Sequence, residues 1–220
     1  MKPLSLDHVA FWVADRETIA ARCERYFGMH IIDRQANFTL LGTSARHGKI
    51  TLFDAQAPRE QGLFRRLGLR VSDLEAARAL LPAGSPEIVD LGEGLNVTLV
   101  AADTEVEYDL DHVVLASPDP AAAALDYQRY GFEPDANGLP SVAGATVELE
   151  RAAVSAGERP LLNHLALLVE SAEAHRDEAL SLGIEVESEV DAANTRAVFV
   201  WGPDRVRIEY VEHKPTFSLT

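Results

Sequence analysis

The sequence predicts an α+β fold of four βαβββ modules, which form two paired-module domains with cupped, mixed β-sheets. The first observation behind this prediction is an internal repeat, LDHVAFWV at 6–13 and LDHVVL at 110–115, close to half of the 220 residues apart. The second is a fainter copy of the same pattern at 66–81 and 163–183. Together they divide the chain into four units that begin near residues 5, 64, 108 and 161.

Each predicted unit opens with an apolar run of strand length, followed by a signal for the start of a helix. The runs cover 8–13, 67–71, 112–116 and 164–169. Side chains that can cap the free amides of a helix start come next: Asp15, Ser72, Asp119 and Ser171. Ser72 is followed by Glu75 in a capping-box pattern, and Pro120 suits the first helical position after Asp119. Residues that favour the end of a helix close each pattern: Gly28, Pro82, Gly131 and Gly183.

Short β-prone stretches separated by turn residues follow each predicted helix. In the last unit they are the two halves of TRAVFVWGPDRVRIEYVE (195–212), which turn at Gly202-Pro203-Asp204. The acidic stretch DTEVEYD (103–109) has no helical spacing and joins the two halves of the chain. The sequence therefore predicts an N-terminal domain at 1–104 and a C-terminal domain at 105–220, each made of two modules.

The composition excludes several kinds of partner. Twenty Lys and Arg against 35 Asp and Glu give a net charge of −15, which repels phosphate backbones and anionic lipid. No apolar run approaches the length of a transmembrane helix, and the N-terminal residues do not resemble a signal peptide. The single Cys23 fits a reducing compartment. We therefore expect a cytoplasmic protein that binds neither nucleic acid nor membrane.

Three residues of the second half have the side chains of a metal site. His112 and His164 begin the first strands of units three and four, and Glu209 lies within the β-branched and aromatic run VRIEYV. A carboxylate inside such a strand is costly without a partner. Two imidazoles and one carboxylate on neighbouring strands can hold a divalent metal and leave coordination positions open. The sequence thus predicts that His112, His164 and Glu209 bind a divalent metal.

The first half lacks this set. His8 matches His112, but Arg66 stands where His164 would be, and Leu99 stands roughly where Glu209 would be. Counting from the strand histidine of unit one leads to Phe53 instead of a carboxylate. We therefore expect the first domain to be metal-free and His8 to be structural.

Glu148 and Glu150 are the remaining candidates for chemistry. They lie two residues apart in ATVELERA, the last strand of unit three, and so share one face of that strand. Either is a candidate fourth ligand or a catalytic general base beside the metal. An exposed, charged strand face is the ordinary alternative.

The sequence resembles the vicinal oxygen chelate superfamily, which includes glyoxalases, bleomycin-resistance proteins and extradiol ring-cleaving dioxygenases. The resemblance lies in LDHV at 6–9 and 110–113, NHLALLV at 163–169 and WGPDRVRIEYVE at 201–212. It implies modules that pair into a cupped sheet around a divalent ion, which the substrate chelates through two neighbouring oxygens. It also implies that His112, His164 and Glu209 are the ligands.

A four-module chain with one metal site resembles the extradiol dioxygenases most. This resemblance implies a small catechol-type substrate, O2 as co-substrate, and Fe(II) or sometimes Mn(II) as the ion. Extradiol enzymes usually have a further histidine before the second ligand histidine and a tyrosine about ten residues before the ligand glutamate. The corresponding stretches, ELERAAVSAG and TRAVFVW, contain neither, and Phe199 falls about where the tyrosine is expected.

Two other functions remain open from the sequence. A glyoxalase-type lyase or isomerase would use two histidines and two glutamates around Ni(II) or Zn(II), with Glu148 or Glu150 as the second carboxylate. A non-catalytic protein of the bleomycin-resistance type would sequester a drug or metabolite, but such relatives generally lack the ligand set. The exposed edges of the modules also make a homodimer an expectation.

Overall fold

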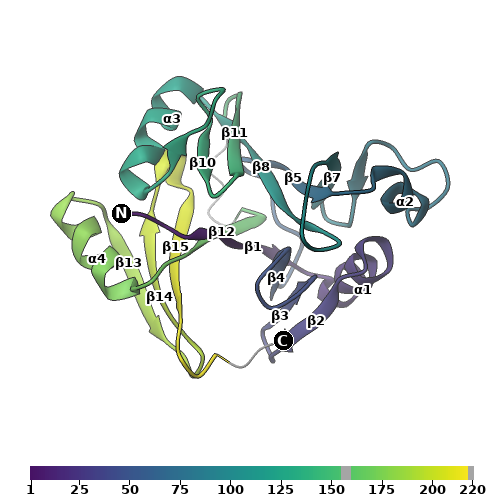
Figure 1. The fold of residues 1–220 in the computed structure, drawn as a ribbon, viewed down its shortest axis with the longest axis horizontal. Coiled ribbons are helices and arrows are strands. Elements are labelled where there is room, and N and C mark those ends of the chain that lie inside the picture. The colour runs from purple at the N-terminus through teal and green to yellow at the C-terminus, as the bar shows by residue number, and fades with distance from the viewer. Residues whose placement is uncertain (155–159, 218–220) are drawn as a thin grey trace.

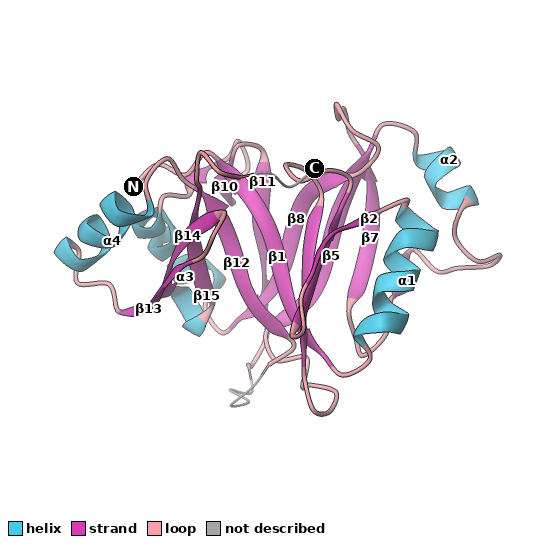
Figure 2. Ribbon diagram, turned by 90° about the horizontal axis from the view of Figure 1, so that it is seen from below, coloured by secondary structure: helices cyan, strands magenta, loops and turns pink. Residues whose placement is uncertain are grey.

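A computed structural model describes residues 1–154 and 160–217, which form two mixed β-sheets flanked by helices (Figures 1 and 2). The elements of the first two modules are β1 (Ser5–Val13), α1 (Arg16–Phe27), β2 (His30–Arg34), β3 (Phe38–Gly42), β4 (Lys49–Asp54), β5 (Phe64–Val71), α2 (Leu74–Ala79), β6 (Ile88–Asp90) and β7 (Asn96–Ala101). Those of the last two are β8 (Asp109–Ser117), α3 (Pro120–Tyr127), β9 (Glu133–Pro134), β10 (Pro140–Val142), β11 (Ala145–Arg151), β12 (Leu162–Leu168), α4 (Ala172–Ser181), β13 (Val186–Asp191), β14 (Thr195–Trp201) and β15 (Arg207–His213). Short 3-10 turns cover Gln128–Tyr130 and Pro203–Arg205.

The helix caps explain where the helices begin. The side chains of Asp15 and Ser171 accept hydrogen bonds from backbone amides of the first turns of α1 and α4, as the sequence predicts. In module two the cap is Asp73, one residue after the predicted Ser72, and its carboxylate accepts from the amide of Ala76. Helix α1 ends at Gly28, whose φ of 65° suits a residue without a Cβ.

The modules pair differently from the expectation that each half forms its own sheet. The eight-stranded sheet has the order β13-β14-β15-β12-β1-β4-β3-β2, so it joins module four to module one through the antiparallel pair β1–β12. The seven-stranded sheet has the order β6-β7-β5-β8-β11-β10-β9 and joins modules two and three through β5–β8. Each half of the chain therefore contributes one module to each sheet. The boundary near residue 104 stays a prediction.

The hydrophobic core lies between the sheets and under the helices. Strand β1 alternates, so that Val9, Phe11 and Val13 face the core while His8, Ala10 and Trp12 share the other face. The ring of Phe11 packs edge-on against that of Phe64 on β5 at 5.0 Å, which brings the two sheets into contact. Figure 2 shows α1 and α2 on one side of the sheets and α3 and α4 on the other. Among the described residues, no helix is long and apolar enough to cross a membrane.

Candidate metal centre

Three ligand atoms converge on one face of the eight-stranded sheet. They belong to His8 on β1, His164 on β12 and Glu209 on β15, which are adjacent strands at the centre of the sheet (Figure 1). The register of the strands brings these residues together. His8 and Glu209 both pair with Ala166 on β12, and His164 lies two residues earlier on the same face of that strand. His8 Nε2 lies 3.0 Å from His164 Nε2 and 3.4 Å from Glu209 Oε2, and His164 Nε2 lies 2.8 Å from Glu209 Oε2.

These separations fit ligands of one metal ion. With metal–ligand distances of about 2.1 Å, two ligand atoms at a right angle lie roughly 3.0 Å apart. The arrangement is also unfavourable without a cation, since three electron-pair donors meet in a region where His164 and Glu209 are 2% and 7% exposed. The donor set, two imidazole nitrogens and one carboxylate, is that of a facial triad. His8, His164 and Glu209 therefore form a group that could hold a divalent metal ion.

Each histidine is oriented by the residue that precedes it. Asp7 Oδ2 lies 2.8 Å from His8 Nδ1, and Asn163 Oδ1 lies 3.0 Å from His164 Nδ1. An oxygen at Nδ1 holds the proton on that nitrogen and leaves Nε2 free to bind a metal. Arg207 Nη1 donates to the same Asn163 Oδ1 at 3.1 Å, which fixes the amide in this orientation.

Asp7 is itself held by a buried cation. Lys49 Nζ on β4 donates to Asp7 Oδ1 at 2.8 Å, and His213 Nε2 lies 3.2 Å from the same oxygen. Lys49 is 1% and Asp7 4% exposed, so the pair is almost fully removed from water. Burial disfavours the ionised carboxylate, but Lys49, His213 and His8 outweigh it and hold the pKa of Asp7 well below its usual range. The His8 ring is thus anchored on an ionised aspartate.

The two Nε2 atoms and the carboxylate that face one another carry one proton between them at neutral pH. Burial opposes the charged form of His8, but hydrogen bonds to Asp7 and Glu209 prevail and raise the pKa of His8 to about 9. Burial lowers the pKa of His164, even though Glu209 acts in the opposite direction. Burial also disfavours ionised Glu209, yet close contacts with His164 and His8 hold the pKa of Glu209 below its usual range. At neutral pH the metal-free cluster therefore carries its proton on His8.

Binding of a divalent ion is expected to release about one proton per ion between about pH 6 and 8. With a pKa of about 9, His8 is protonated throughout this range, and Nε2 must lose its proton before it can bind a metal. Affinity should therefore rise about tenfold per pH unit and level off above the pKa of His8. Calorimetric titration with Zn²⁺ in two buffers of different ionisation enthalpy measures the proton number, and a value near zero would contradict the raised pKa.

The structure does not bring His112 to this cluster. His112 lies on β8 in the seven-stranded sheet, where its Nδ1 is 2.7 Å from Asp111 Oδ1. Its ring packs on Gly68, since a Cβ built at Gly68 would lie 2.2 Å from the imidazole. His8, expected to be structural, takes the place predicted for His112 because module four pairs with module one. The one sequence signal for His8 is the LDH motif that it shares with His112.

Glu148 and Glu150 lie in the same seven-stranded sheet, on β11. Arg66 Nη1 donates to Glu150 Oε1 at 2.8 Å, and Arg66 Nη2 lies 3.7 Å from Glu148 Oε2. Among the described residues, the group that could hold a metal ion comprises His8, His164 and Glu209 and neither of these glutamates. The structure thus places both candidates for a fourth ligand or base beside an arginine.

Solved structures of the same architecture match nearly the whole chain. A protein of Bacillus subtilis subsp. subtilis str. 168, described provisionally as a dioxygenase, superposes with a TM-score of 0.76 at 15% identity, over 98% of this chain and 87% of its own. Glyoxalase I of Zea mays superposes with a TM-score of 0.72 at 14% identity, over 94% of this chain and 92% of its own. The cppA protein of Streptococcus pneumoniae TIGR4 superposes with a TM-score of 0.69 at 13% identity, over 96% of this chain and 98% of its own.

The chain has the glyoxalase/dioxygenase fold. At these identities the likeness establishes the fold, and it confirms the α+β class predicted from the repeats. No model of a protein family matches the sequence, and no curated protein matches it.

The repeated module of this fold defines a counterpart of Glu209 in every module. Glu209 pairs with the residue two positions after His164. In module one, Ala10 lies two positions after His8 and pairs with Thr51, so Thr51 is the counterpart of Glu209 there. Thr51 lies two residues before Phe53, the position predicted from the sequence. In modules two and three the counterparts are Thr98, next to the predicted Leu99, and Glu148. The cluster thus has three candidate ligands, and Thr51 occupies the fourth equivalent position.

In the second sheet, the equivalent positions differ from the candidate ligand set by one residue. Its equivalent positions carry His112, Arg66 and Glu148, and the register matches, since His112 pairs with Gly68 as His8 pairs with Ala166. Arg66→His is therefore expected to raise the zinc content after dialysis from one to two ions per chain, as measured by elemental analysis. Arg66→Ala, the control, should leave it at one; a content of one in both variants would refute the equivalence.

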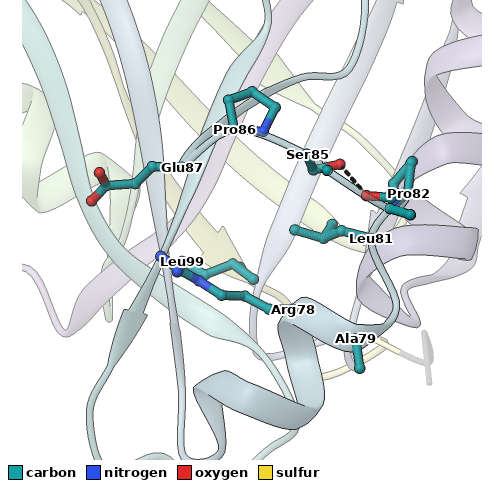
Figure 3. A pocket seen from close by; sticks show the side chains of 10 residues that line it. Arg78, Ala79, Leu81, Pro82, Ser85, Pro86, Glu87 and Leu99 are labelled. Carbon is teal, nitrogen blue, oxygen red and sulfur yellow. Dashed lines mark hydrogen bonds between the residues drawn. The ribbon is translucent and has the colours of Figure 1, made fainter.

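A separate cavity of about 310 Å³ lies in module two, between α2 and β7 (Figure 3). It is lined by Arg78, Leu81, Glu87 and Leu99, and the hydroxyl of Ser85 donates to the carbonyl of Pro82 on its wall at 2.7 Å. None of the three ligands lines this cavity. The cavity in module two and the cluster on the eight-stranded sheet are therefore separate features.

Proposed function

We propose that the chain is an Fe(II)-dependent, extradiol-type dioxygenase that cleaves a small catechol. The observation that carries the proposal is the three-ligand set of His8, His164 and Glu209, with Thr51 where a fourth ligand would be. A divalent ion held by three adjacent ligands would act as a Lewis acid with open positions for both catechol oxygens and for O2. A site closed by a fourth protein ligand has one position fewer.

The ligand set favours this activity over that of a glyoxalase. A glyoxalase-type centre needs a second glutamate. In module one, the position equivalent to Glu209 carries Thr51 instead. Glu148 and Glu150 belong to the other sheet and contact Arg66. The fold does not separate the two activities, since both kinds of protein share it, so the donor set carries the choice.

The chain's own residues would position the substrate and exclude water. The rings of Phe199 and Phe53 lie 5.3 and 6.1 Å from the His164 ring, so apolar groups flank the ligands on both sides. Phe199 pairs directly with Glu209 across β14–β15 and stands near the position expected for the extradiol tyrosine. A phenyl ring moves no proton, so we give Phe199 a packing role beside His164.

The decisive experiment measures oxygen uptake by protein purified and loaded with Fe(II) under anaerobic conditions. On addition of catechol and air, we expect O2 consumption and a yellow ring-cleavage product, and Glu209→Ala should abolish both. Absence of uptake by the iron-loaded protein, with turnover of a hemithioacetal by the Ni(II) or Zn(II) form, would favour the glyoxalase activity. Stoichiometric binding of an aromatic ligand by a metal-free, inactive protein would instead favour a sequestering protein.

A further inference from the structure

Aromatic side chains extend from the metal cluster along the same face of the sheet. Trp12 pairs with Phe53 between β1 and β4, and Phe38 pairs with Phe53 between β3 and β4. The Trp12 and Phe38 rings lie 5.4 and 5.5 Å from the Phe53 ring, which in turn lies 6.1 Å from His164. All three aromatic residues are partly exposed. A flat, aromatic ring can pack against such a face.

Two arginines border this aromatic face, and they differ in what they already bind. Arg207 lies 3.8 Å above the Phe199 ring and donates to Asn163 and to Glu187 at 3.1 and 2.5 Å. Its charge is therefore compensated within the protein. Arg59 lies 5.6 Å above the Trp12 ring, and its buried Nε has no hydrogen-bond partner among the described residues. A buried guanidinium nitrogen without an acceptor is unfavourable, which makes Arg59 the group suited to an incoming anion.

The spacing along the sheet matches a substituted aromatic ring. Ala10 pairs with His164, and Trp12 follows Ala10 by two residues, so Trp12 lies about 7 Å beyond the level of His164. A ring bound to the cluster through two adjacent oxygens would extend over Phe53 toward Trp12. A carboxylate on its far side would then reach the region of Arg59.

From these contacts we propose that the substrate is a catechol with an acidic substituent, which Arg59 binds as a carboxylate. This inference builds on the proposed function and adds the substrate class. The charges agree with it, since a divalent ion on two histidines and one glutamate suits a catecholate, while Arg59 supplies a separate cation.

The test compares ligand affinities without turnover. Protein loaded with Fe(II) is titrated anaerobically with catechol and with 3,4-dihydroxyphenylacetate, and binding is followed by the change in absorbance. Wild type should bind the carboxylated ligand roughly 10- to 100-fold more tightly, as expected for a charge-assisted hydrogen bond. Arg59→Gln should bind the two ligands about equally, because it loses affinity for the carboxylated ligand and keeps its affinity for catechol. Arg78→Gln, at the cavity of module two, is the matched control and should keep the preference.

The outcomes separate this inference from the proposed function. Equal affinity of wild type for the two ligands, or a preference that survives in Arg59→Gln, would overturn the role of Arg59 while leaving catechol binding intact. Failure of the iron-loaded protein to bind either catechol would overturn the proposed function. In that case phenylacetate is titrated into metal-free protein: binding that is lost in Arg59→Gln supports an aromatic-acid site, and no binding refutes it.

Discussion

Replacing His8 with alanine is expected to lower the affinity for a divalent ion by at least about 100-fold, the upper limit for loss of a group that merely supports a ligand. His8 would supply one of the three ligand atoms and is anchored by Asp7, so its removal would leave two ligands and a buried cavity. His112→Ala should leave the affinity unchanged, because His112 lies in the other sheet. Competition with a chromophoric chelator for Zn²⁺ measures both variants.

The two histidines make this a matched comparison, since both follow LD in the same repeat and both bond an aspartate through Nδ1. Circular dichroism would show that each variant keeps its fold. Metal affinity that falls in His112→Ala and persists in His8→Ala would mean that module four pairs with module three instead of module one.

Lys49→Met is expected to destabilise the metal-free protein by about 3 kcal/mol, near the lower end of the cost of breaking a buried ion pair. The substitution keeps the approximate length of the side chain but leaves Asp7, which is 4% exposed, without the Lys49 ammonium. The remaining contacts with His8 and His213 hold the cost at this lower end. Urea unfolding at neutral pH in the presence of a chelator measures the free energy of unfolding.

Two further variants test that interpretation of the Lys49–Asp7 pair. Lys214→Met removes the cation from an exposed pair with Asp191 and should change stability little. Asp7→Leu combined with Lys49→Met removes both buried charges and should recover part of the loss. A double variant less stable than Lys49→Met would show that Asp7 stabilises the fold without Lys49.

Sequence patterns predicted the local structure well, because that structure follows from local chemistry. The apolar runs, the caps Asp15 and Ser171, and the stop at Gly28 lie where they were expected. The repeat predicted that the modules are alike, and the fold confirms it. Asp73 replaced Ser72 as a cap because both residue types accept the same hydrogen bonds, so the pattern allows either start.

Sequence patterns did not predict the pairing of the modules, on which the candidate site depends. His164 and Glu209 belong to one module, so a module-level pattern was enough to place them together. The third candidate ligand comes from the strand that lies beside β12. Both β1 and β8 contain LDH near their start, so the sequence fits either strand. That choice depends on how whole sheets bury their surfaces. Counting from the histidine also missed Thr51, because the loops between strands differ in length from module to module.

The pairing of the first module with the last determines when the metal site can form during synthesis. His8 and Glu209 are about 200 residues apart, and the ribosome adds roughly 5 to 20 residues per second, so about 10 to 40 s separate their appearance. Throughout most of that time the edge of β1 that later pairs with β12 is uncovered. A nascent chain must therefore protect an apolar strand edge before it can bind metal, and neither half synthesised alone contains all three ligands.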